Sequence, residues 1–252
     1  MYGWRARLGL IVPSTNTTVE PEFHAFAPRG VASFATRVPV AEATRAEDKV
    51  GTIVAMRARL DAAALEVASL GPAVIGYACT SGSFLEGRDS DRATCSALAA
   101  LTGIPVLTTS TALTAALATL GATKVALVTP YIEPVSAGAR EYLAQTGVEV
   151  VGHADLGLLS NLDKGRLGAE ESYRLARTVD VDGAEAVVIS CTNWRTLDIA
   201  GALEADLGIP VVTSNQATLW ALLRLAGISE PLLPSGRLLS EPLASVPDYV
   251  FP

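Results

Sequence analysis

The chain contains the same three segments twice, in the same order, and this internal repeat limits the folds that it can adopt. Residues 7–13 (RLGLIVP) return as 124–130 (KVALVTP), 73–81 (AVIGYACTS) as 186–193 (AVVISCTN), and 103–110 (GIPVLTTS) as 208–215 (GIPVVTSN). Each copy of the last segment opens a stretch rich in Ala and Leu. The repeat therefore predicts a molecule built from two similar halves that are related by a pseudo-two-fold axis.

Short β-branched runs alternate with segments rich in Ala, Leu, Glu and Arg, a pattern typical of βα units with parallel sheets. We expect strands at 7–12, 33–38, 73–78, 106–108, 124–128, 149–154, 186–189 and 211–213, several of them apolar on both faces. Helices are expected at 48–70, 90–101, 111–120, 134–146, 170–179, 196–207 and 216–225. Five of the residues from Ser229 onward are proline, which predicts an extended tail packed over the body.

These elements predict an α/β fold with two pseudo-symmetric halves, each a short parallel sheet flanked by helices. The first half is expected to comprise residues 1–115 with the C-terminal tail 220–252, and the second half residues 116–219. In such sheets ligands bind beyond the carboxyl ends of the strands. We therefore expect an active site in the cleft between the halves.

Composition excludes several classes of function. The 252-residue chain has a net charge of −7, so it lacks the basic footprint by which proteins bind nucleic acid. Two histidines and three cysteines without close pairing predict neither a metal site nor a disulfide framework, which fits a cytoplasmic protein. His24 and His153 lack neighbours that would support hydrolysis, and both are interpreted as structural. No apolar run approaches the roughly 18 residues needed to span a membrane, so we expect no membrane partner.

Two of the three cysteines occupy equivalent places in the repeat. Cys79 and Cys191 each follow a predicted strand and precede a threonine, Thr80 or Thr192. A turn of this kind that feeds a helix brings the sulfur near backbone N–H groups, so we expect both thiol pKa values to be lowered. Facing thiols suit chemistry in which one acts as base or nucleophile and the other returns a proton. The alternative is that a strand-end cysteine is a small buried hydrophobe, the interpretation that we adopt for Cys95.

Polar residues beyond the same strands extend the candidate site. Ser14 and Asn16 follow the first strand, and Tyr131 follows its repeat. These side chains can form neutral hydrogen bonds with a carboxylate, and Ser81 and Asn193 complete the set together with the two threonines. The alternative is that Ser14 and Asn16 cap a helix and Tyr131 packs at the seam between the halves.

The motifs resemble the aspartate/glutamate racemase superfamily, and within it the branch of maleate cis–trans isomerases and arylmalonate decarboxylases. The resemblance covers nearly the whole chain and is carried by 9–20 (GLIVPSTNTTVE), 77–79 (YAC), 125–131 (VALVTPY), 189–191 (ISC) and 236–239 (GRLL). It implies two flavodoxin-like halves, an enzyme that needs no cofactor, and assembly as a homodimer or homotetramer.

The resemblance also implies roles for individual residues. Cys79 resembles the nucleophile of the isomerases and Cys191 the opposing acid/base cysteine, while Asn16, Tyr131 and Asn161 resemble positions that bind carboxylates. Decarboxylase members keep only the second cysteine, so Cys79 argues against simple decarboxylation. The chain departs from the isomerase pattern at 80–83 (TSGS) and 192–195 (TNWR), where the Cys-Thr pairs are closer to amino-acid racemases.

The leading hypothesis is a small-carboxylate isomerase that converts maleate to fumarate by thiolate addition from Cys79, with Cys191 as acid/base. Two alternatives stay open. The same thiols could racemise an amino acid or another carbon acid, as in relatives from ectoine breakdown, or the protein could bind a small acid without catalysis. Trp194 would narrow the pocket and Arg195 could pair with a second carboxylate, unless these two side chains face the core and the solvent.

Overall fold

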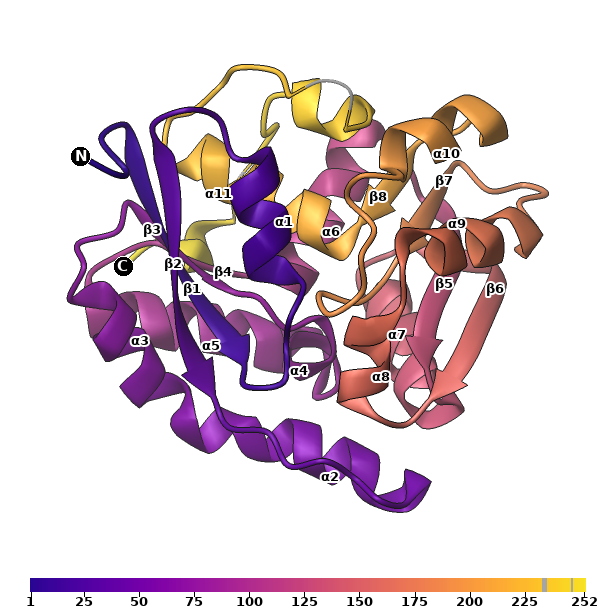
Figure 1. Ribbon diagram of the computed structural model, residues 1–252, viewed down its shortest axis with the longest axis horizontal. Coiled ribbons are helices and arrows are strands. Elements are labelled where there is room, and N and C mark those ends of the chain that lie inside the picture. Colours follow the sequence, from indigo (N-terminus) through magenta and orange to yellow (C-terminus); the bar gives the residue numbers. More distant parts are fainter. Residues whose placement is uncertain (233–234, 246) are drawn as a thin grey trace.

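The computed structural model describes residues 1–232, 235–245 and 247–252, and within them two separate four-stranded parallel sheets. The first sheet contains β1 (Ala6–Pro13), β2 (Val31–Val38), β3 (Val74–Tyr77) and β4 (Val106–Thr108) in the order β2-β1-β3-β4. The second contains β5 (Lys124–Tyr131), β6 (Glu149–Leu158), β7 (Ala186–Ile189) and β8 (Val211–Thr213) in the equivalent order β6-β5-β7-β8. Figure 1 shows the two sheets as separate bodies, and the predicted pair of α/β halves is confirmed.

The central strands lie in the core because they carry apolar side chains on both faces. Every residue of β3 and β7 is buried, as is every residue of β5 after Lys124. Helices on each side of a parallel sheet remove both faces from water, which is why these strands read as continuous apolar runs. The edge strand β6 is only partly buried.

The repeated GIPV segments mark equivalent helix boundaries. Gly103 and Gly208 end helices with φ of 68° and 73°, the left-handed conformation that glycine adopts at little cost. Thr108 and Thr213 then cap the next helices by accepting from the N–H groups of Thr111 and Gln216. Each cap of this type stabilises its helix by about 1 kcal/mol.

Helices cover the sheets and join the two halves. On the first half lie α1 (Val19–Phe26), α3 (Leu60–Ala68), α4 (Thr80–Phe84) and α5 (Gly87–Thr102), and on the second α7 (Glu133–Gln145), α8 (Asn161–Arg166), α9 (Ala169–Thr178) and α10 (Ala200–Leu207). Helices α6 (Thr109–Leu120) and α11 (Ser214–Leu225) pack on each other near the centre of Figure 1. The division that we proposed from the sequence has its boundaries inside these two joining helices.

The single long helix predicted for 48–70 is wrong. The segment forms a 3₁₀ turn (Ala46–Asp48), α2 (Lys49–Val54), a second 3₁₀ segment (Ala55–Arg59) and then α3. The interruption has a physical reason, because the two parts pack on different neighbours. Helix α3 packs on β1 and β2, whereas α2 contacts α4 and α7, and Ile53 and Met56 line a cavity. A straight helix could not serve both surfaces, and a 3₁₀ turn changes the face that the chain presents.

The C-terminal tail packs over the body, as expected, with its first 3₁₀ segment against α11 and its second against α5, but it is not wholly extended. One-turn 3₁₀ segments occupy Arg237–Ser240 and Asp248–Val250, and residues 233, 234 and 246 of the predicted tail lie outside the described residues. Trp220 and Arg224 of α11 both donate to the carbonyl oxygen of Glu241 at 2.9 Å. These bonds attach this part of the tail to α11, one of the two joining helices.

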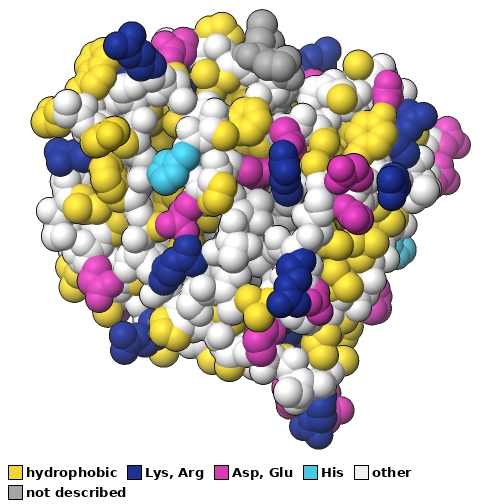
Figure 2. Space-filling model, viewed as in Figure 1, with side chains coloured by type: hydrophobic (Ala, Val, Ile, Leu, Met, Phe, Trp, Pro, Cys, Tyr) yellow, Lys and Arg dark blue, Asp and Glu magenta, His cyan; other side chains and the backbone are white. Residues whose placement is uncertain are grey.

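Charged side chains of both signs are interspersed on the face shown in Figure 2. That distribution agrees with the acidic net charge and offers no continuous basic surface on this face for a polyanion. Among the helices of the described chain, none combines the length and the apolar character required to cross a membrane.

Candidate active site

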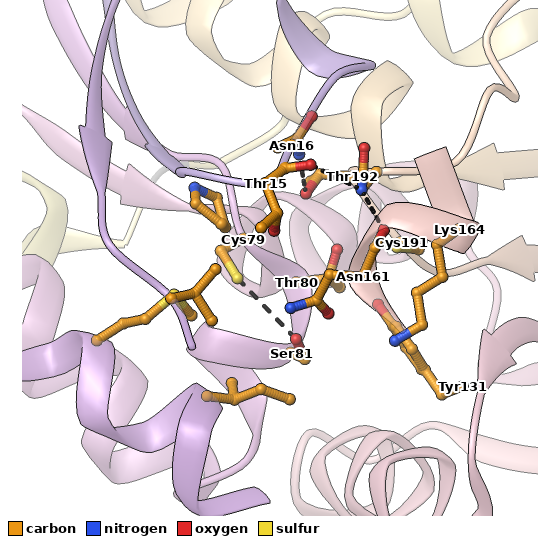
Figure 3. Close-up of a pocket in the computed structure, with 15 residues that line it drawn as sticks. Thr15, Asn16, Cys79, Thr80, Ser81, Tyr131, Asn161, Lys164, Cys191 and Thr192 are labelled. Atoms are coloured by element: carbon orange, nitrogen blue, oxygen red, sulfur yellow. Dashed lines mark hydrogen bonds between the residues drawn. The ribbon is translucent and has the colours of Figure 1, made fainter. Parts of the chain in front are cut away.

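A cavity of about 40 Å³ lies between the halves, where the carboxyl ends of strands from both sheets meet. Both candidate thiols, of Cys79 and Cys191, belong to its wall (Figure 3). The full lining is Pro13, Thr15, Asn16, Val40, Ile53, Met56, Cys79, Thr80, Ser81, Tyr131, Asn161, Lys164, Cys191, Thr192 and Asn193. A cavity of this size holds only a few water-sized groups, so it suits a small molecule.

The structure brings together all the sequence-predicted site residues except Ser14. The Ser14 hydroxyl accepts from the Val40 N–H at 3.1 Å and supports the loop after β2, so Ser14 does not line the cavity. Asn16 lines the cavity and also holds the start of α1, because its Oδ1 accepts from the N–H groups of Thr18 and Val19. The two interpretations considered for Asn16 are therefore compatible.

Cys79 is the N-cap residue of α4 and is surrounded by neutral donors. Its Sγ accepts from the Gly82 N–H at 3.4 Å and lies 4.0 Å from the Ser81 hydroxyl. Burial nevertheless raises the pKa of the Cys79 thiol to about 11, an effect that these donors and the Tyr77 hydroxyl only partly offset. The expected lowering of this pKa is wrong, because removal from water penalises the thiolate more than neutral hydrogen bonds stabilise it.

Cys191 does not feed directly into a helix, since α10 begins only at Ala200. Its N–H donates to the Ser214 hydroxyl at 3.0 Å, and the neighbouring Thr192 hydroxyl donates to the Ala78 carbonyl oxygen in the other half. Burial raises the pKa of the Cys191 thiol, and the positive charge of Lys164 is the largest opposing influence. Here too the expected lowering is wrong, for the same reason of burial.

The loop after Cys191 is held by Glu22 of α1, a residue that sequence reasoning missed. Glu22 Oε1 accepts from the N–H groups of Thr196 and Leu197 at 2.8 and 2.9 Å, and Oε2 accepts from Asn215 Nδ2. The helix predicted from 196 starts later, at Ala200. Burial raises the pKa of Glu22 to about 7, against the opposing effect of its donors.

The chain as a whole matches the arylmalonate decarboxylase family over residues 8–239. The protein belongs to this family. It is 30% identical to a maleate isomerase of Geobacillus stearothermophilus over 248 residues, which cover 93% of this chain and 97% of that protein. The resemblance inferred from the motifs is confirmed.

Solved structures of maleate isomerases have the same fold. A variant from Pseudomonas putida with maleate matches with a TM-score of 0.87 at 27% identity, covering 93% of this chain and 97% of that one. A cysteine-to-serine mutant from Nocardia farcinica, with a covalently bound succinylcysteine intermediate, matches with a TM-score of 0.85 at 28% identity, covering 93% and 98%. This family member is therefore an enzyme of the aspartate/glutamate racemase superfamily.

Several residues singled out in the sequence lie away from this family member's cavity. Cys95 is fully buried in α5, with its Sγ 3.8 Å from the Thr111 hydroxyl. Trp194 is also fully buried, and Arg195 forms an ion pair with Asp198. Neither Trp194 nor Arg195 is among the cavity-lining residues.

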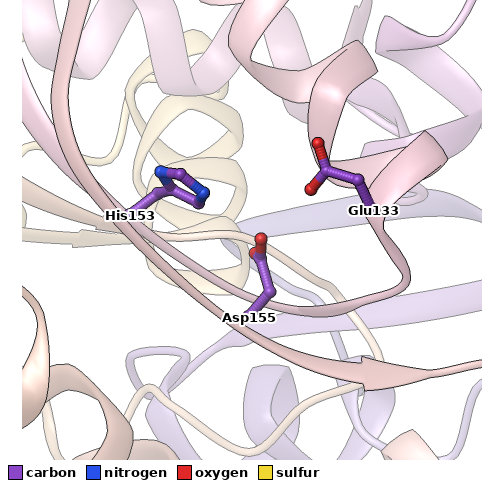
Figure 4. Close-up of side chains that lie close together, drawn as sticks. All are labelled: Glu133, His153 and Asp155. Carbon is purple, nitrogen blue, oxygen red and sulfur yellow. The ribbon is translucent and has the colours of Figure 1, made fainter.

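His153, interpreted as structural, lies beside two carboxylates on the second half. His153, Glu133 and Asp155 offer ligand atoms within 4.8 Å of one another (Figure 4). Arg140 already pairs with Glu133 and lies 3.8 Å from Asp155, whose Oδ1 also accepts from the hydroxyl of Ser136. An arginine thus supplies the positive charge at this cluster, which lies outside the cavity between the halves.

Two lysines, Lys49 and Lys164, are the charged residues at the cavity that sequence reasoning missed. Lys164 belongs to its lining, and Lys49 donates to Asn161 Oδ1 at 2.8 Å. Lysine is uncommon here, since only three of the 19 basic residues are lysine. The scarcity of lysine is the one feature of the sequence that could have drawn attention to these two residues, although scarcity does not by itself indicate burial.

Proposed function

We propose that this enzyme converts maleate to fumarate without a cofactor. The observation that carries the proposal is that the cysteines at equivalent repeat positions, Cys79 and Cys191, line one small cavity. The relatives support it, since maleate isomerases align along nearly the whole chain and one solved relative holds a succinylcysteine intermediate. A decarboxylase needs only one thiol, so the presence of two free thiols in the wall favours isomerisation.

In the proposed mechanism, the Cys79 thiolate adds to one alkene carbon of maleate. The electron pair of the double bond moves toward the neighbouring carbon and its carboxylate, and the Cys191 thiol delivers a proton to that carbon. The product is a succinyl thioether whose central bond is single and can rotate. The Cys191 thiolate then removes a proton from the same carbon, the double bond re-forms as the trans isomer, and Cys79 leaves as thiolate.

The polar wall divides into groups that hold the turns and groups that we propose bind carboxylate. The hydroxyls of Thr80 and Thr192 donate to Ser214 and Ala78, so they fix the two cysteine turns. The hydroxyl of Ser81, the phenol of Tyr131 and the amide of Asn161 face the cavity from different elements and are the proposed carboxylate donors. Donors aimed at charge that develops during addition contribute to catalysis because they need no reorganisation.

Proton NMR of purified protein with maleate in deuterated, reducing buffer tests the proposal. We expect fumarate to appear with wild-type protein and with Cys95→Ser, whose thiol lies outside the cavity, and not with Cys79→Ser. Absence of fumarate from the wild-type reaction would reject maleate isomerisation. Solvent deuterium at the α-carbon of an amino acid, with loss of optical rotation, would indicate a racemase instead.

A further inference from the structure

Two of the three lysines in this chain are buried beside the cavity, one from each half. Lys49 of α2 is 0% exposed and Lys164 of α8 is 4% exposed. Among the described residues, neither ammonium group has a carboxylate oxygen within 4.0 Å. The third lysine, Lys124, is exposed and lies 3.9 Å from Glu149.

A buried ammonium group without an anionic partner is costly, because desolvation is not compensated by Coulomb attraction. Lys49 has partial compensation from one hydrogen bond, to Asn161 Oδ1. Lys164 Nζ donates no hydrogen bond to the described residues and lies 5.3 Å from the centroid of the Tyr131 ring, which gives only a weak cation–π attraction. Both pKa values are lowered, chiefly by burial, and that of Lys49 falls to about 8.

The cavity offers these cations no carboxylate of its own. Its fifteen lining residues include no Asp or Glu. The carboxylate that acts on both lysines is that of Glu42, which is exposed and accepts from the Asn161 N–H at 3.1 Å. In Figure 3, Lys164 lies beside Tyr131 on one side of the cavity, across from Cys79 and Ser81. The cavity therefore has a positive side that is matched to an anionic group.

We propose that Lys164 binds the second carboxylate of a dicarboxylate substrate and that Lys49 positions Asn161 for the same carboxylate. Because Lys49 occupies Asn161 Oδ1, the amide nitrogen of Asn161 remains available to donate. Lys164 and Asn161 lie three residues apart in the single helix α8, so they present their donors from the same element. This inference rests on the proposed function and restricts its substrate class to small dicarboxylates.

Calorimetric binding of succinate and succinamate tests the assignment without turnover. Succinate has two carboxylates and no double bond, and succinamate replaces one carboxylate by a neutral amide of similar size. We expect wild-type protein to bind succinate about tenfold to a hundredfold more tightly, as for a hydrogen bond between charged groups. Lys164→Met should remove most of this preference while leaving the succinamate Kd within about twofold, because Met keeps the apolar stem but not the charge.

Two further variants complete the experiment. Lys124→Met, on the surface, should retain the wild-type preference for succinate. Lys49→Met should reduce the preference in the same direction as Lys164→Met with the succinamate Kd unchanged, which a merely structural role would not produce.

Equal binding of both ligands by wild-type protein would overturn the inference. A uniform loss of affinity for both ligands in Lys164→Met would also overturn it, because Lys164 would then shape the cavity without recognising charge. The two proposals can fail separately. If the protein binds succinate selectively but forms no fumarate from maleate, the carboxylate subsite stands and only the proposed isomerisation is rejected.

Discussion

The two Cys-Thr turns are equivalent in sequence, yet their surroundings differ in charge and in support. At the turn of Cys79 the thiol caps α4 and has contacts within the next three residues, while the neighbouring Thr80 hydroxyl donates to Ser214 on α11. The turn at Cys191 is fixed from outside, by Ser214 on α11 and by the carbonyl oxygen of Ala78 in the other half. Both turns therefore share Ser214, but only the first also has a cysteine that caps its own helix.

The electrostatic difference suits the different roles that we propose. Neutral N–H and hydroxyl groups are the largest influences that oppose burial at Cys79, whereas the charge of Lys164 is the largest at Cys191, and both lysines act more strongly on Cys191 than on Cys79. A thiolate at Cys79 is consumed when it adds to carbon, but a thiolate at Cys191 must persist while the adduct rotates. Cations near Cys191 stabilise that second anion, so a pseudo-symmetric backbone supports an asymmetric reaction.

The largest expected effect comes from removing each thiol separately. We expect Cys191→Ser to lower turnover of maleate by about 10²–10⁴-fold, the usual contribution of a positioned acid/base. Because Cys79 is still present, this variant should accumulate a covalent maleate adduct detectable by intact-protein mass spectrometry. Cys79→Ser should be inactive and remain unmodified.

Cys95→Ser is the matched control, since Cys95 is free and buried but lies outside the cavity. It should behave as wild type. An adduct formed on Cys79→Ser, with none on Cys191→Ser, would reverse the proposed roles of the two turns.

The second effect depends on pH and concerns Glu22, which holds the loop after Cys191. The pKa of buried Glu22 is raised from 4.5 to about 7, so its stabilising contribution is complete below about pH 4.5 and is lost as the pH rises through 7. Relative to Glu22→Gln, which does not titrate, wild-type protein should lose on the order of 3 kcal/mol of unfolding free energy between pH 5 and pH 8. Urea unfolding of both proteins at the two pH values measures this difference.

Glu20→Gln, in the same helix but on its exposed side, supplies the control for Glu22. Because Glu20 is only partly buried, Glu20→Gln should give a smaller pH-dependent difference from wild type than Glu22→Gln. A Glu22→Gln difference that is no larger would show that the carboxyl group titrates normally in the folded protein.

Much of the fold could be predicted from the sequence because its signals are local. The eight strands follow apolar runs, and Gly103 and Thr108 mark helix ends by their own backbone and hydroxyl chemistry. The break between α2 and α3 could not be predicted, because each half of that segment is a good helix and only tertiary packing separates them.

The candidate site also has a part that the sequence predicts and a part that it does not. The repeat indicated Cys79 and Cys191 as the candidate thiols. The sequence contains no measure of burial, so the direction that we expected for their pKa shifts was wrong. Glu22, Lys49 and Lys164 were missed because each lies far along the chain from the turn that it supports, or has neighbours typical of a surface helix.

A third effect tests how tightly the local Cys79 turn is packed. A Cβ at Gly82 would lie 2.2 Å from the Tyr77 hydroxyl and 3.0 Å from Cys79 Sγ. Tyr77 is buried, so Gly82→Ala should destabilise the protein by about 1–3 kcal/mol, as overpacking does elsewhere. Gly51→Ala is the control, because nothing lies within 4 Å of its added Cβ and Ala favours the helix. Comparable melting temperatures for the two variants would contradict this close packing.

The smallest expected effect separates the charges at the two turns. Lys164→Met removes the cation that most opposes the effect of burial on Cys191, so the pKa of Cys191 should rise further while that of Cys79 changes less. Iodoacetamide alkylation, followed by peptide mass spectrometry from pH 7 to pH 10, measures both thiols in one sample. At a fixed pH the Cys191 rate should fall by about tenfold per unit of added pKa, because only the thiolate reacts. Equal slowing at both cysteines would mean that Lys164 acts on the whole cavity, and the electrostatic distinction between the turns would be lost.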